Sequence, residues 1–134
     1  ERTNEKCICF VLVLALLVTT VAFAADTLSF SSKTGKYAPT IKTKTSATGS
    51  SGSVTVSSNA GGHSMYYQIH KANGGAATVY KNTSGTGTYT LSYEKDGYGN
   101  SLGRNGYDYR LRVAHRSQCS CTSGSAVVKV DFTP

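Results

Sequence analysis

Two cysteines, Cys119 and Cys121, have the spacing that points most directly to chemistry in this 134-residue chain. They stand in the segment SQCSCTSGS, where four states compete: a local disulfide, a bridge to another chain, a metal site, or free thiols. The α-carbons of residues two apart lie near the upper limit that a disulfide spans. A closed metal site needs about four ligands, and His115 is the one nearby candidate. Because a secreted chain favours oxidation, we expect a local or intermolecular disulfide and no metal or cofactor.

Residues suited to hydrolysis are present but are not arranged for it. The three histidines form no H-x-x-H, H-x-H or H-E-x-x-H pattern; they are His63, His70 and His115. Ser64 follows His63, yet it lies in no G-x-S-x-G turn that would present a nucleophile. Glu94 and Asp96 are the carboxylates closest in sequence, and they flank a turn. We therefore expect no catalytic residue and a protein that is not an enzyme.

The glycine-rich segment DGYGNSLGRNG, residues 96–106, is the candidate binding loop. Phosphate-binding loops of similar composition connect a strand to a helix, whereas the pattern here predicts a strand after the loop. The side chains in the segment are of the kinds that adaptable binding loops use. The predicted binding residues are Tyr98, Asn100, Arg104 and Asn105.

Basic side chains outnumber acidic ones by 14 to 7, which gives a net charge of +7. Lys42 and Lys44 share one face of their segment, and Arg110 and Arg112 share the outward face of the clearest predicted strand. These four residues are the candidate basic patch. On an extracellular surface such a patch attracts anionic polymers: teichoic acid, acidic polysaccharide or anionic lipid headgroups. The alternative is that the cations only keep the protein soluble and protect the sheet edges.

Residues 1–25 have the features of a secretory signal peptide. A polar start is followed by a short apolar run, residues 8–18, and then by the small-residue exit Ala22-Phe23-Ala24-Ala25. That apolar run is shorter than the roughly 20 residues of a membrane-spanning helix. We expect a leader helix over residues 1–25, one mature domain over residues 26–134, and a secreted product that does not span a membrane.

Apolar and polar residues alternate with a period of two in six stretches of the mature chain: residues 27–31, 53–57, 65–70, 88–93, 107–113 and 127–132. This period predicts strands, with weaker candidates at residues 36–45 and 77–81. Seven or eight strands with one apolar face each predict two packed antiparallel sheets. The expected fold class is therefore all-β, an immunoglobulin-like or jelly-roll sandwich, with a small closed barrel as the alternative. Tyr107 is the candidate for a tyrosine that bonds back to the preceding loop at a sandwich corner.

The strand segments TLSF, GTYTLSYE, YDYRLRV and VVKVDFTP resemble those of small uncharacterised secreted β-sandwich proteins of Gram-positive bacteria. The resemblance is one of strand pattern, and it implies no site residues. Together with the charge, it implies a secreted, non-enzymatic cationic protein that binds at the cell surface or in the extracellular matrix. The partners expected are anionic envelope polymers or polysaccharide, and not nucleic acid. The alternative is a secreted antimicrobial, bacteriocin-like or toxin-like protein that acts on target cell envelopes.

Overall fold

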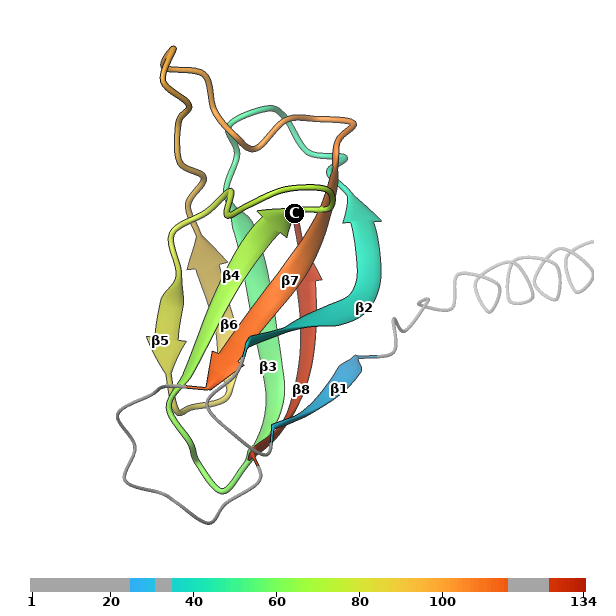
Figure 1. Ribbon diagram of the computed structural model, residues 1–134, viewed down its shortest axis with the longest axis vertical. Coiled ribbons are helices and arrows are strands. Elements are labelled where there is room, and N and C mark those ends of the chain that lie inside the picture. Colours follow the sequence, from blue (N-terminus) through green and yellow to red (C-terminus); the bar gives the residue numbers. More distant parts are fainter. Residues whose placement is uncertain (1–24, 31–34, 116–125) are drawn as a thin grey trace, which may run out of the picture.

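The structure, a computed structural model, describes residues 25–30, 35–115 and 126–134, and within these ranges the chain forms strands and no helix. The eight strands are β1 (Asp26–Phe30), β2 (Gly35–Thr43), β3 (Gly52–Ala60), β4 (Met65–Lys71), β5 (Lys81–Thr83), β6 (Gly87–Leu91), β7 (Asp108–His115) and β8 (Ala126–Thr133). They form two four-stranded antiparallel sheets, in the orders β1-β8-β3-β6 and β2-β7-β4-β5 (Figure 1). The prediction of two packed antiparallel sheets is confirmed. The predicted leader helix lies outside the described residues.

Alternation along each strand explains why the sheets pack. In β7 the side chains of Tyr109, Leu111 and Val113 are buried, whereas Arg110 and Arg112 between them remain partly exposed. In β8 the same alternation buries four side chains: Ala126, Val128, Val130 and Phe132. Burying a side chain of the size of Val, Leu or Phe stabilises the fold by about 1.5–3 kcal/mol. The core between the sheets therefore follows directly from the period of two in the sequence.

The two weaker strand predictions have different outcomes. The segment 36–45 forms β2, whose pairing with β7 shifts register between Tyr37 and Ile41. Pro39 lies inside this irregularity, as expected for a residue without an N–H to donate to a ladder. The segment 77–81 forms no strand of its own and contributes the isolated bridge between Thr78 and Tyr93. The strand expected there begins later, at β5.

Three long connections meet at one end of the sandwich, at the top of Figure 1: residues 44–51, 72–80 and 92–107. Backbone hydrogen bonds join the first and the third of them. The amide of Lys44 donates to the carbonyl oxygen of Tyr107 at 2.9 Å, and the amide of Gly106 donates to that of Lys44 at 2.7 Å. This end is consequently a set of mutually bonded loops.

The tyrosine that bonds back to the preceding loop is Tyr109, and the prediction of Tyr107 for this role is wrong. The Tyr109 hydroxyl donates to the carbonyl oxygen of Leu102 at 2.6 Å and accepts from the amide of Arg104 at 2.8 Å. β7 begins at Asp108, so Tyr109 is the first aromatic residue whose position in the strand directs its ring into the core. Tyr107 precedes the strand and is 58% exposed.

Candidate binding sites

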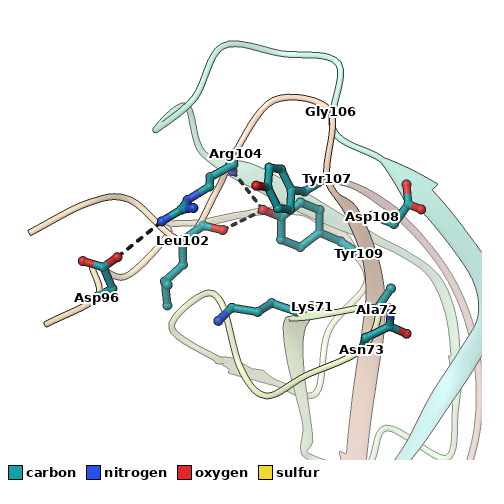
Figure 2. A pocket seen from close by; sticks show the side chains of 10 residues that line it. All are labelled: Lys71, Ala72, Asn73, Asp96, Leu102, Arg104, Gly106, Tyr107, Asp108 and Tyr109. Carbon is teal, nitrogen blue, oxygen red and sulfur yellow. Dashed lines mark hydrogen bonds and ion pairs between the residues drawn. The ribbon is translucent and has the colours of Figure 1, made fainter. Parts of the chain in front are cut away.

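A cleft of about 490 Å³ opens at the loop end of the sandwich (Figure 2). Ten residues line it: Lys71, Ala72, Asn73, Asp96, Leu102, Arg104, Gly106, Tyr107, Asp108 and Tyr109. They come from the end of β4 and the turn after it, from the 92–107 connection, and from the start of β7. We call this site the loop-end cleft.

Asp96 organises the connection that forms one wall of the loop-end cleft. Its Oδ1 atom accepts hydrogen bonds from the backbone amides of Tyr98 and Asn100, each at 2.9 Å. Its Oδ2 atom lies 3.3 Å from the Arg104 guanidinium, as Figure 2 shows. The backbone donors of Asn100 and Tyr98 lower the pKa of the Asp96 carboxyl group. These bonds stabilise the ionised form of the carboxyl group. They also join Asp96 to Tyr98, Asn100 and Arg104, and in this way they close the loop.

Of the four predicted loop residues, three line hollows and one does not. Asn100, Arg104 and Asn105 border a shallow depression of about 400 Å³ next to the loop-end cleft. Tyr98 is 93% exposed and lines neither hollow. The side-chain amide of Asn105 donates to two carbonyl oxygens of the 44–51 connection, at 2.9 and 3.0 Å. Asn105 therefore ties two loops together, and its bonding capacity is largely used.

Sequence reasoning missed Lys71 and Asp108, which lie in the same cleft as Asp96 and Arg104. Lys71 ends β4, and Figure 2 shows its side chain extending into the cleft. The Asp108 carboxylate accepts a hydrogen bond from the Thr43 hydroxyl at 2.5 Å. A charged residue at a strand end beside a turn is the signal that could have marked both positions. The cleft thus offers an ammonium group and partly used carboxylates to a small polar ligand.

Lys44 does not belong to a surface patch, which corrects the prediction for this residue. Its side chain is 0% exposed. The ammonium donates to the Ser46 hydroxyl at 2.6 Å and to the carbonyl and hydroxyl oxygens of Ser50 at 2.9 and 3.1 Å. It also lies 4.9 Å from the centre of the Tyr93 ring. Burial lowers the pKa of the Lys44 ammonium, and its bonds hold the 44–51 connection closed over the core.

Lys42 connects the two sheets at their edge. Its ammonium lies 2.5 Å from the Asp131 carboxylate and 2.8 Å from the carbonyl oxygen of Phe132. Both partners belong to β8 of the opposite sheet, whereas Lys42 belongs to β2. Much of its charge is therefore compensated within the protein, and Lys42 contributes little to an attractive surface.

Arg110 and Arg112 do lie on the outer face of the sheet β2-β7-β4-β5, as their alternation with buried residues predicts. Five further side chains adjoin them, four from strands of that sheet and Tyr80 from the segment before β5. We call the set of seven the aromatic–arginine face: Tyr37, Tyr66, Gln68, His70, Tyr80, Arg110 and Arg112. The Arg110 guanidinium stacks on the Tyr37 ring at 3.6 Å from its centre. Among the described residues neither arginine has a carboxylate within ion-pair distance. Their charge is therefore available to a ligand.

A chain of hydrogen bonds fixes the side chains beneath the two arginines. The Tyr37 hydroxyl lies 3.2 Å from His70 Nδ1, and His70 Nε2 lies 2.9 Å from the Gln68 side-chain oxygen. Gln68 in turn donates to the carbonyl oxygen of Thr78 at 2.8 Å. Burial lowers the pKa of the His70 imidazole, and the positive charges of Arg112 and Arg110 lower it further. A neutral His70 that donates from Nε2 satisfies every bond in this chain.

The residues considered for hydrolysis are engaged elsewhere or lie apart. The Ser64 hydroxyl donates to the Asn82 side-chain oxygen at 2.7 Å, and the His63 ring packs against His115 with 5.3 Å between ring centres. The part of the chain that the structure describes contains no group of three or more His, Cys, Asp or Glu residues suited to a metal ion. Cys119 and Cys121 lie outside the described residues, so the disulfide stays a prediction.

Comparison of the chain with protein-family models, with curated proteins and with solved structures found no match. A search of the described ranges found no helix long and apolar enough to cross a bilayer.

Proposed function

We propose that this chain is a secreted, non-enzymatic cationic protein that binds anionic polymers at the cell surface or in the extracellular matrix. Secretion follows from the leader pattern of residues 1–25. The observation that carries binding is the aromatic–arginine face, where Arg110 and Arg112 lie without a carboxylate partner among the described residues. Such arginines attract polyanions and form paired hydrogen bonds with acidic groups.

We further propose that the sandwich is a jelly roll and not an immunoglobulin-like domain. The proposal is supported by the strand pairs β1–β8, β2–β7, β3–β6 and β4–β5, the pattern of one long hairpin rolled into two sheets. In an immunoglobulin domain the last two strands are neighbours in one sheet; here β8 pairs with β1 and β3. Jelly rolls occur in lectins among other proteins, an analogy of fold that does not by itself determine function.

Binding to washed Gram-positive cells, whose walls carry anionic polymers, tests the proposal. We expect the protein to sediment with the cells and to be released by moderate salt, because screening weakens exposed charge interactions. A variant with Arg110→Gln and Arg112→Gln should bind about tenfold more weakly. The matched control carries Lys95→Gln and Lys129→Gln, which remove the same charge from exposed positions outside the aromatic–arginine face.

Three results would contradict the proposal. Equal loss of binding in the arginine variant and the lysine control would mean that net charge alone drives attachment. Turnover of an ester, glycoside or peptide library by the purified protein would refute the non-enzymatic part. Killing of an indicator strain by the purified protein would favour an antimicrobial or toxin-like function.

A further inference from the structure

We propose that the hollow lined by Tyr66, Tyr80 and Arg112 on the aromatic–arginine face binds a uronic acid residue of an acidic polysaccharide. This inference rests on the proposed function and names the class of polymer that the face recognises. It assigns sugar recognition to the tyrosine rings and carboxylate recognition to Arg112.

The hollow has the walls that a single sugar ring requires. It measures about 290 Å³ and is lined by Tyr66, Gln68, Tyr80, Arg112 and Ala114. The two tyrosine rings meet nearly at right angles, at 80°, with 4.9 Å between their centres. The small Ala114 side chain leaves space beside them. The volume lies at the lower limit of small-molecule sites, which suits one ring of a polymer whose remaining units stay in solvent.

Tyr80 provides a stacking surface that the protein leaves uncovered. Its side chain is 61% exposed, although the ring is held from one side by Tyr66. A tyrosine ring offers an apolar face and a polar hydroxyl at its tip. The C–H face of a pyranose ring packs on such a surface, and its hydroxyl groups bond to polar groups at the rim. Poly-L-glutamate and polyphosphate contain no pyranose ring that could pack on Tyr80 in this way.

Arg112 supplies the charge complement for a carboxylate at the edge of this hollow. Gly35 of β2 lies against the Arg112 side chain, and a side-chain carbon at Gly35 would overlap the guanidinium. Because β2 is the neighbour of β7 on the side away from β4 and β5, the guanidinium lies at the β2 side of the hollow, and a ligand meets it at that rim. None of the five residues that line the hollow carries a carboxylate. Because guanidinium and carboxylate groups match in a two-bond geometry, an acidic sugar fits this site better than a neutral sugar.

A second pair of side chains extends the site along the sheet. Arg110 lies two residues before Arg112 on the same face of β7 and stacks on Tyr37, which is 38% exposed. Residues two apart on a strand are separated by about 6.6 Å, a distance comparable with the length of one sugar residue. The chain of hydrogen bonds from Tyr37 through His70 to Gln68 holds these three side chains in place beside the arginines. Neighbouring acidic sugars of one chain can therefore contact neighbouring arginines.

Titration calorimetry with three probes at about 0.15 M salt separates sugar recognition from charge. The probes are oligogalacturonate, neutral galacto-oligosaccharide and poly-L-glutamate, and we expect the oligogalacturonate to bind at least tenfold more tightly than either of the others. Tyr80→Ala should weaken oligogalacturonate binding about tenfold and leave poly-L-glutamate binding unchanged. Tyr98→Ala, at a tyrosine of the 92–107 connection that is 93% exposed, is the matched control and should change neither.

Arg112→Gln should weaken the binding of both acidic probes about tenfold, whereas Lys129→Gln should change it less than twofold.

The outcomes separate this inference from the proposed function. If oligogalacturonate and poly-L-glutamate bind with equal affinity and Tyr80→Ala changes neither affinity, sugar recognition is overturned, and the proposed binding of polyanions still stands. Equal affinity for the neutral and the acidic sugar overturns the role of Arg112. If no probe binds although the protein still sediments with cells, the uronic acid inference fails by itself. If it also fails to sediment, the proposed function fails with it.

Discussion

The loop-end cleft is the larger hollow and contains more charged groups, yet the aromatic–arginine face has more bonding capacity left for a ligand. At the loop end Asp96 bonds to two amides and to Arg104, and Asn105 bonds to two carbonyl oxygens. On the face, Arg112 has no carboxylate partner among the described residues, and Tyr80 is largely exposed. The difference shows that the volume of a hollow and the number of charged groups in it do not tell how many bonds those groups can still make to a ligand. A polar group that already holds a loop must break its bonds before it binds a ligand.

This comparison assigns different effects to substitutions in the two regions. Changes at the loop end should lower the free energy of unfolding and leave polyanion binding by the folded protein intact. Changes at Arg112 and Tyr80 should lower binding and leave the free energy of unfolding nearly unchanged, because side chains that are at least partly exposed contribute little to it.

The largest loss of stability is expected for Lys44→Ala. This change removes a fully buried side chain and leaves the Ser50 carbonyl oxygen without the ammonium it bonds. We expect the free energy of unfolding to fall by about 2–4 kcal/mol, measured by urea denaturation. Lys95→Ala, at an exposed position, is the control and should change stability by less than about 0.5 kcal/mol. A stable Lys44→Ala protein with weakened polyanion binding would restore Lys44 to the basic patch.

Tyr109→Phe should lower stability by about 1–3 kcal/mol, because it leaves the Leu102 carbonyl oxygen and the Arg104 amide without their partner. Thermal unfolding followed by circular dichroism measures the loss. The matched control is Tyr107→Phe, which removes the same hydroxyl two residues earlier at an exposed ring. Similar losses for the two variants would contradict the corner role of Tyr109.

The smallest predicted effect is the dependence of stability on pH through His70. Because the folded state lowers the pKa of His70 below the ordinary value of 6.5, the unfolded chain binds more protons when the pH lies between the two values. The His70 contribution is therefore fully present above about pH 6.5 and is lost as the pH falls through the folded pKa. Arg112→Gln should raise the His70 pKa, since it removes one of the neighbouring positive charges; NMR titration of the imidazole measures it. Arg104→Gln at the loop end should leave it unchanged, and an unchanged His70 pKa in Arg112→Gln would contradict the arrangement of the face.

The sequence predicted the regular part of the molecule well and the irregular part poorly. A period of two determines which side of a strand faces the core, so the outward position of Arg110 and Arg112 followed from their buried neighbours. Lys44 lies just beyond the end of β2, where the alternation no longer applies. Its burial depends on how the 44–51 connection closes over Tyr93, a contact distant in sequence. The choice between Tyr107 and Tyr109 for the corner tyrosine has a related cause. It depends on the residue at which β7 begins, and the sequence pattern did not define that residue.

The hollow lined by Tyr66 and Tyr80 could also not be predicted from the sequence. Tyr66 belongs to β4, whereas Tyr80 lies in the irregular segment before β5, and only the pairing of β4 with β5 brings them together. Arg112 reaches the same place from β7. Alternation within one strand does not say which other strands lie beside it, so a site built across three strand segments requires the folded structure.

The central claim is that ligands bind to the sheet face and not to the loop end, and NMR chemical-shift mapping tests it most directly. Isotope-labelled protein is titrated with oligogalacturonate while the backbone amide signals are followed. We predict that the largest shifts occur around Gln68 and Arg112, with residues 96–107 nearly unaffected. Largest shifts within residues 96–107 and at Lys71 would contradict the claim and make the loop-end cleft the binding site.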